Sequence, residues 1–274
     1  MHKINLYFII IIICLVSLVF TFIILKTVFS PAIRKESIPQ SLLAFKKAYP
    51  SHIISVKKNA LVFKDETEMV YDDGIFDKDF DMLLNSPDLE DQFSIPYPAG
   101  RTYVIPIPVN HDPGRIRFEP FFKKIYGATP EEVKNKLTTI YWMPLTVNIP
   151  IKVTTVNSVH DKLKKISAEC DLLPHHLKKY VTKLGGTYKW RNIQNTERLS
   201  MHSLGIAIDI NTEYSDYWLK DDPGLDNLYK YKNSIPMEIV NIFEKYGFIW
   251  GGKWYHYDTM HFEYRPELFI NRKE

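Results

Sequence analysis

An unbroken apolar run opens the chain. Residues 6–25 read LYFIIIIICLVSLVFTFIIL, contain no charged side chain and are followed by Lys26. About 20 helical residues at 1.5 Å each span about 30 Å, the thickness of the hydrocarbon core of a bilayer. We therefore expect one N-terminal transmembrane helix and a membrane anchor over residues 1–29. A buried core helix and a cleaved signal peptide are the alternatives; the length of the run and Pro31, directly after the small residue Ser30, favour an uncleaved anchor.

The pattern between the anchor and residue 95 is mixed. Residues 30–40 are polar and contain proline, as in a linker. Two short apolar runs, 60–63 and 69–71, flank a polar turn and predict a β-hairpin. The acidic stretch 77–91 predicts a solvated surface helix or loop. We assign residues 30–95 to a linker and a small N-terminal region, and the sequence does not indicate its role.

Proline and glycine interrupt the next segment. Residues 95–108 resemble a strand but contain four prolines, so we expect an edge strand or an extended arm. The sequence NHDPG at 110–114 predicts a turn. Arg115 and Arg117 follow this turn, and they are either solvated or directed at an anionic peptide substrate.

The helical period becomes clear after residue 153. A helix is expected after Asn157, which can cap it, because apolar residues recur every three or four positions: Val159, Leu163, Ile166 and Cys170. A second helix is expected over 174–184, since it would begin with proline and end at Gly185-Gly186.

Short strands and one more helix complete the pattern. We expect strands at 187–193, 205–210 and 261–264, a helix at 236–246 closed by Gly247, and a turn at Gly251-Gly252. Helices beside a small antiparallel sheet make an α+β fold, which we assign to a domain over residues 96–274.

Composition narrows the class of protein. Hydrophobic residues make up 45% and aromatic residues 14% of the chain, which is ample for a packed core. The net charge of +3 comes without a basic stripe, so we expect no nucleic-acid partner. Of the two cysteines, Cys14 lies in the apolar run and Cys170 is left alone, so any metal ion must be bound by nitrogen and oxygen.

One apolar stretch carries an isolated histidine and an isolated aspartate. In a strand over 205–210, Gly205, Ala207 and Asp209 share one face, and the three isoleucines share the other. With the isoleucines packed inward, glycine and alanine would leave the sheet face beside Asp209 free of bulky side chains, as an open floor. His202 has the wrong parity to join it, so the chain must bend near residues 203–205, which glycine permits.

A histidine and a carboxylate that converge suggest a metal site. His261, in the sequence WYHYDTMHFEY, is the best candidate for a third ligand. Two histidines and one carboxylate leave the fourth position of a zinc ion open to water, as in catalytic rather than structural sites. Zinc lowers the pKa of such a water to about 7.

Two separated signatures resemble those of a known family. SMHSLGIAID matches S-x-H-x-x-G-x-A-x-D, and WGGKW followed by DTMHF matches W-G-G-x-W…D-x-x-H-F. These resemble the signatures of the zinc peptidases that include D-alanyl-D-alanine carboxypeptidases and L-alanyl-D-glutamate endopeptidases of bacterial cell walls. The W-G-G-x-W form looks closest to the endopeptidase branch. The resemblance covers residues 185–266.

The resemblance implies roles for individual residues. His202, Asp209 and His261 would bind Zn²⁺. Asp258 would be the general base, taking a proton from water and delivering it to the leaving amine. Glu263 shares a strand face with His261 and would be either a rival base or a residue that orients this ligand.

The family also uses an arginine to bind the substrate carbonyl. Arg191 in YKWRNI is the candidate and Arg198 the alternative, since the usual G-Y-R is absent. Trp254 and His256 are candidates for the wall of a substrate-binding cleft. Ser200 is not expected to be a nucleophile, because no G-x-S-x-G surrounds it.

The implied function is zinc-dependent hydrolysis of peptide bonds in peptidoglycan stem peptides. Charges around the anchor mildly favour a cytoplasmic C-terminus, whereas this chemistry requires the cell exterior, which we adopt. We expect a single-pass membrane protein with an extracytoplasmic catalytic domain; secretion after cleavage is the alternative. The sequence does not indicate which bond is cut.

Two other classes compete with the peptidase. Non-haem iron(II) oxygenases also use two histidines and a carboxylate, but a spacing of seven residues and the surrounding helices argue against them. A catalytically inactive zinc-fold binding module, as in hedgehog signalling domains, would keep the ligands but lack the general base or the arginine. Asp258 therefore favours an enzyme.

Overall fold

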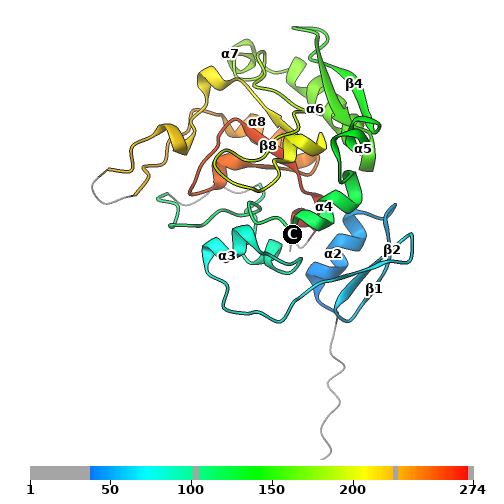
Figure 1. The fold of residues 1–274 in the computed structure, drawn as a ribbon. Helices are drawn as coiled ribbons and strands as arrows, with labels where there is room; N and C mark the ends of the chain where they lie inside the picture. Colours follow the sequence, from blue (N-terminus) through cyan, green and yellow to red (C-terminus); the bar gives the residue numbers. More distant parts are fainter. Residues whose placement is uncertain (1–37, 101–104, 225–227, 271–274) are drawn as a thin grey trace, which may run out of the picture. The chain divides into compact units, whose positions relative to one another are not determined.

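The computed structural model describes residues 38–100, 105–224 and 228–270, which combine short helices with three small antiparallel sheets (Figure 1). The expectation of an α+β fold is confirmed. The anchor expected at 6–25 lies outside the described residues. Within the described ranges, none of the helices combines the length and the apolar character that crossing a bilayer requires.

The N-terminal part is a helix on a three-stranded meander. Helix α2 (Gln40–Ala48) contacts β1 (Ile53–Lys57), which pairs with β2 (Ala60–Phe63), and β2 pairs with β3 (Glu68–Val70). The predicted hairpin is confirmed as β2 and β3, whereas β1 was not expected.

The acidic stretch is less solvated than its composition predicts. Helix α3 (Phe80–Asn85) has no buried residue, as expected of a surface helix. Asp88 and Asp91, however, are buried, because the Lys78 ammonium lies 2.6 Å from the Asp91 carboxylate and 3.4 Å from that of Asp88. An internal ion pair thus accounts for acidic residues that the sequence assigned to the surface.

The proline-rich arm forms no strand in its described part. Residues 95–100 and 105–108 pair with no neighbouring strand, since proline lacks the N–H that a ladder requires. Tyr97 instead packs with Ile249 and Trp254 in a small apolar cluster. The edge-strand alternative is therefore wrong for these residues.

A hairpin and a long helix form the middle of the chain. After α4 (Glu119–Tyr126) and α5 (Pro130–Lys134), β4 (Leu137–Trp142) pairs with β5 (Ile149–Thr154), and α6 (Val159–Asp171) packs on both. The predicted apolar face of α6 is confirmed as buried. Asn157 does not cap it: this residue has a φ of 52°, and its side-chain amide donates to the carbonyl of Ala48 at 3.1 Å.

The second predicted helix is much shorter than expected. Helix α7 covers only His175–Lys178. The carbonyls of Lys179 and Tyr180, which a longer helix would use internally, accept hydrogen bonds from the side chain and backbone of Asn211. The carbonyl of Val181 accepts one from the indole of Trp142. Tertiary hydrogen bonds have therefore replaced the last turns of the helix.

The C-terminal sheet holds two of the predicted ligands. Its order is β6 (Ala207–Asp209), β8 (His261–Tyr264), β7 (Phe248–Trp250), all antiparallel. Helix α8 (Met237–Lys245) confirms the predicted helix and covers one face, where Phe243 stacks on Phe262 with ring centroids 3.9 Å apart. On the other face, Asp209 lies opposite His261. The register of this sheet thus brings two predicted ligands together.

Short 3₁₀ helices connect these elements: η1 (Asp91–Phe93), η2 (Val156–Ser158), η3 (Met201–Leu204), η4 (Thr212–Tyr214), η5 (Trp218–Lys220), η6 (Gly251–Lys253) and η7 (Pro266–Phe269).

Gly205 makes the bend that the sequence required between η3 and β6. Its φ is 66°, and a Cβ at this position would lie 2.7 Å from Leu137 and 3.1 Å from the backbone nitrogen of Thr154. The open floor expected beside Asp209 is wrong, because Ala207 is fully buried in the core and Gly205 packs against the β4–β5 hairpin.

We expect Gly205→Ala to lower the free energy of unfolding by about 2–4 kcal/mol, from a left-handed backbone plus a clash with a packed hairpin. Gly74→Ala is the matched control, since Gly74 has a φ of 81° but nothing within 4 Å of an added Cβ. Denaturant unfolding measures the loss of stability in both variants, and the difference between the two losses gives the cost of the clash. Equal losses in the two variants would contradict the clash.

Candidate active site

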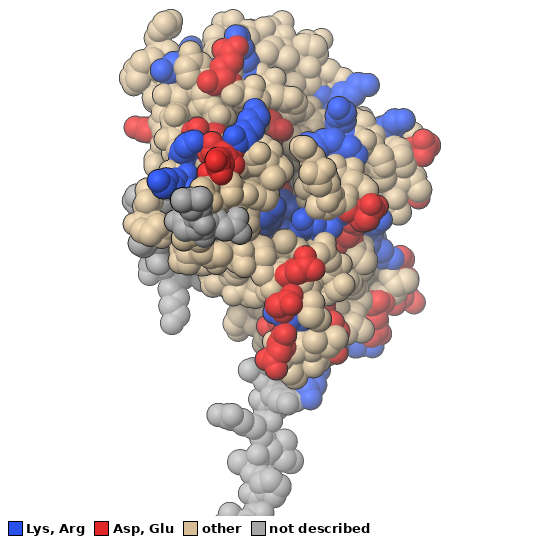
Figure 2. Space-filling model, turned by 60° about the vertical axis from the view of Figure 1, so that its left-hand side comes forward, with Lys and Arg blue, Asp and Glu red and all other residues tan. Residues whose placement is uncertain are grey.

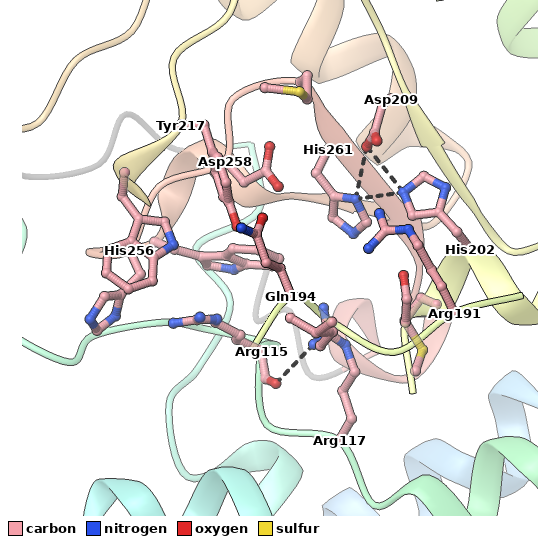
Figure 3. A pocket seen from close by; sticks show the side chains of 16 residues that line it. Arg115, Arg117, Arg191, Gln194, His202, Asp209, Tyr217, His256, Asp258 and His261 are labelled. Carbon is pink, nitrogen blue, oxygen red and sulfur yellow. Dashed lines mark hydrogen bonds and ion pairs between the residues drawn. The ribbon is translucent and has the colours of Figure 1, made fainter. Parts of the chain in front are cut away.

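Three predicted ligands converge on one point of a pocket (Figure 3). His202 comes from η3, Asp209 from the end of β6 and His261 from the start of β8. Nε2 of His202 lies 3.1 Å from Oδ1 of Asp209 and 3.2 Å from Nδ1 of His261, which lies 3.0 Å from the same carboxylate oxygen. The three facing atoms form a nearly equilateral triangle.

The outer nitrogen of each histidine has an oxygen partner. Nδ1 of His202 lies 2.6 Å from the carbonyl oxygen of Thr187, and Nε2 of His261 lies 2.9 Å from the carboxylate of Glu263. An oxygen acceptor places the proton of a neutral imidazole on the outer nitrogen and leaves a lone pair on the inner one. When both imidazoles are neutral, two lone pairs and a carboxylate oxygen face one another, which is the form that binds a metal ion.

The triangle fits a zinc-sized ion. Ligand atoms about 2.0–2.2 Å from a tetrahedral ion lie about 3.3–3.6 Å apart, close to the separations found here. His202, Asp209 and His261 are thus a set that could hold a divalent metal ion, with nitrogen and oxygen donors as zinc accepts.

The chain approaches β6 closely at Gly185 and Gly186. The backbone nitrogen and carbonyl of Asp209 bond with Gly185 and Gly186, and a Cβ on Gly185 would lie 2.9 Å from that of Asp209. The chain then passes Thr187, whose carbonyl holds His202. These glycines, expected to end a helix, instead bring the orienting carbonyl into place.

The strand expected at 187–193 is absent. The hydroxyl of Ser203 accepts a hydrogen bond from the backbone nitrogen of Arg191 at 2.8 Å and lies within bonding distance of the carbonyls of Lys189 and Arg191. A side chain therefore satisfies the backbone groups that a neighbouring strand would have paired.

Glu263 lies behind His261 and takes the orienting role rather than that of a base. It is fully buried, and Arg117 donates to both of its oxygens, with Arg265 a further donor at 3.2 Å. Burial opposes ionisation, but Arg117 and the bond to His261 hold the pKa of Glu263 well below its usual range. The carboxylate thus stays charged, and it supports His261 from outside the pocket.

Asp258 lines the same pocket and points toward the histidines (Figure 3). Its Oδ1 is inaccessible to solvent and has no hydrogen-bond partner in the described part of the chain. Burial and, to a lesser extent, the carboxylate of Asp209 together raise the pKa of this carboxyl to about 6. An unsatisfied carboxylate beside a three-ligand set is a group available to exchange a proton.

The two candidate arginines occupy different places. Arg191 is exposed and lines the pocket of the triad, where the backbone nitrogen of buried Ser200 donates to its carbonyl at 3.1 Å. Arg198 does not line this pocket and lies in a neighbouring one. Of the two, only Arg191 faces the triad.

The predicted cleft-wall residues both line the pocket of the triad. The indole of Trp254 donates to the carbonyl of Pro113, and its ring centroid lies 5.8 Å from that of His261. His256 is fixed by Asp112, which bonds its backbone nitrogen and its Nδ1. Both side chains are thus held in place by the 110–114 turn.

That turn is buried rather than solvated. Asp112 is fully buried and pairs with Arg115 at 2.6 Å, and the side chains of Arg115 and Arg117 are only 12% and 10% exposed. The alternative of solvated arginines is wrong. Sequence reasoning also missed Gln194 and Tyr217 in the pocket wall, and neither position carries a signal that would have identified it.

The site combines three residues that could hold a metal ion with a buried acidic neighbour. Residues 194–264 match a family model described as D-alanyl-D-alanine carboxypeptidase. The match confirms the resemblance of the two signatures, and His202, Asp209, Asp258 and His261 all lie inside the matched segment. Neither the curated proteins nor the solved structures contain a match to this chain.

We expect Glu263→Gln to weaken the binding of a divalent metal ion about 10–100-fold, because the support behind His261 loses its charge while keeping its size. Competition with a chromophoric chelator measures the affinity. Glu238→Gln, an exposed change on α8, is the control. Unchanged affinity in a folded Glu263→Gln protein would contradict the orienting role.

Proposed function

We propose that this chain is a zinc-dependent peptidase that hydrolyses peptide bonds in peptidoglycan stem peptides, of the L-alanyl-D-glutamate endopeptidase or D-alanyl-D-alanine carboxypeptidase type. The single observation that carries the proposal is the unsatisfied Asp258 carboxylate beside a triad suited to a metal ion. The family match over residues 194–264 supports the same reaction class.

The residues present fit a zinc ion, with His202, Asp209 and His261 as its ligands. When bound, the ion would polarise the scissile carbonyl and lower the pKa of an attacking water. Thr187 and Glu263 hold the two imidazoles in the tautomers that face the ion, so little reorganisation accompanies its binding.

Asp258 moves the proton in this proposal. Its carboxylate takes a proton from the attacking water and returns it to the nitrogen of the leaving amine, which needs a base of moderately raised pKa. Burial supplies that rise. General acid–base catalysis of this kind contributes about 10²–10⁴-fold to the rate.

Arg191 binds the substrate carbonyl in the same scheme. Its guanidinium lies on the triad side of the pocket (Figure 3), and its one hydrogen bond to the described chain is a 3.4 Å contact with the carbonyl of Asn192. It therefore has donors to offer to the oxygen on which negative charge develops.

We expect Asp258→Ala to reduce turnover by about 10²–10⁴-fold while zinc remains bound, since this residue does not belong to the triad. His202→Ala should lose both zinc and turnover. Mass spectrometry of digested muropeptides measures turnover and identifies the bond cut, and metal analysis measures zinc; Asp161→Asn, exposed on α6, is the control. A fully active Asp258→Ala protein would overturn the assigned base, and zinc binding without any hydrolysis by the unaltered chain would favour a catalytically inactive binding module.

We further propose that residues 6–25 anchor the protein, with the rest of the chain outside the cytoplasm. Support comes from the length of the uncharged run and from the location of the substrate. The full chain should remain in the membrane pellet after an alkaline wash, and a chain lacking 6–25 should be soluble. Loss of the N-terminal segment from the mature protein, detected by its mass, would indicate cleavage and secretion instead.

A further inference from the structure

A second pocket adjoins the one that holds the triad. Arg115, Arg117, Ile193 and Met201 line both pockets, so the cleft continues from the histidines past the arginines. The second pocket also contains Arg198 and the end of α3, and it encloses about 220 Å³. This volume suits one polar side chain rather than a whole peptide.

The face shown in Figure 2 is hollowed at its middle, with Lys and Arg side chains gathered inside the hollow. Among the residues that line the second pocket, three are arginines and only Glu119 is acidic. Glu119 is already engaged, since it pairs with Lys123 at 2.5 Å and accepts the backbone N–H of Leu199 at 3.0 Å. The pocket therefore has an excess of positive charge.

The three arginines differ in what neutralises them. Arg115 pairs with Asp112 and Arg117 with Glu263. The guanidinium of half-buried Arg198 forms no ion pair or hydrogen bond within the described ranges, and its Nε is inaccessible to solvent and without a partner. A partly buried cation without a counter-charge is less stable than a paired one, and an anion that enters the pocket would supply the missing partner.

The charges around Arg198 also favour the binding of an anion. Burial and the positive charges of Arg115 and Arg117 together lower its pKa to about 10, against the weaker opposing effect of Asp81 and Asp112. Guanidinium groups bind carboxylates through two parallel hydrogen bonds, which gives both affinity and orientation.

We propose that Arg198, together with Arg115, forms a second subsite that binds a carboxylate side chain of an acidic peptide substrate whose scissile bond lies at the triad. The inference deepens the proposed function and rests on it. The two candidate arginines then have different roles, since Arg191 faces the triad, whereas Arg198 selects the substrate at a distance from the reacting bond.

Pairs of synthetic stem peptides test the subsite. The two members of each pair differ only by a carboxylate or an amide at one position, and the pairs move this position along both sides of the scissile bond. For the full-length protein, one pair should show at least a tenfold preference for the carboxylate in kcat/KM, mainly through KM. Arg198→Gln should reduce that preference to within twofold, and Arg198→Lys should retain part of it.

Binding of the same peptides to the metal-stripped full-length protein, measured by calorimetry, gives a readout that does not need catalysis. Lys134→Gln, an exposed change on α5, controls for total charge and should keep the preference. Hydrolysis of all peptides with no preference, or a preference that survives in Arg198→Gln, would overturn the subsite and leave the proposed function standing. Preferential binding through Arg198 without hydrolysis would support the subsite and overturn the proposed function.

Discussion

The convergence of two imidazoles and a carboxylate on one point is the constraint on which the rest of the site depends. Two imidazole nitrogens and a carboxylate oxygen face one another within 3.2 Å, and an oxygen atom behind each imidazole fixes the orientation of its ring. The β6–β8 register sets one pair of these groups, and the left-handed turn at Gly205 brings in the third. Local backbone geometry thus produces a centre that could hold a divalent cation.

A network of buried charges supports this centre from behind. Arg265 is fully buried; it bonds the carbonyl of Gly114 and bridges Glu263 to Glu267. Removing one partner from such a network leaves an uncompensated charge, which costs far more than the intact pairing gains. Gly114 closes the turn that fixes His256, so the support of the ligands and the wall of the cleft are parts of one assembly.

The sequence predicted the parts of the site that follow a local period. The parity of residues 202–209, the bend at Gly205 and the strand of His261 are all properties of a few neighbouring residues. Contacts between residues far apart in the sequence could not be predicted. Glu263 and Arg117 are 146 positions apart, and no pattern near either residue indicates the other. The prediction of a strand at 187–193 was wrong for a related reason. The side chain of Ser203, rather than a neighbouring strand, forms hydrogen bonds with the backbone of these residues. Helical periods were reliable where an apolar face met the core, as in α6 and α8, and unreliable where tertiary acceptors competed, as after α7.

The hydroxyl of Tyr49, at the end of α2, donates to the carboxylate of Glu267 at 2.7 Å. Tyr49 belongs to residues 30–95, for which the sequence indicated no role. It lies at the end of a buried network that runs from Glu267 through Arg265 to Glu263 and His261. A chain trimmed to its peptidase signatures would expose the Glu267 carboxylate and loosen the scaffold behind the ligand. Helix α2 thus supports the candidate metal site from behind, so the segment needed to hold its ligands in place begins well upstream of the signatures.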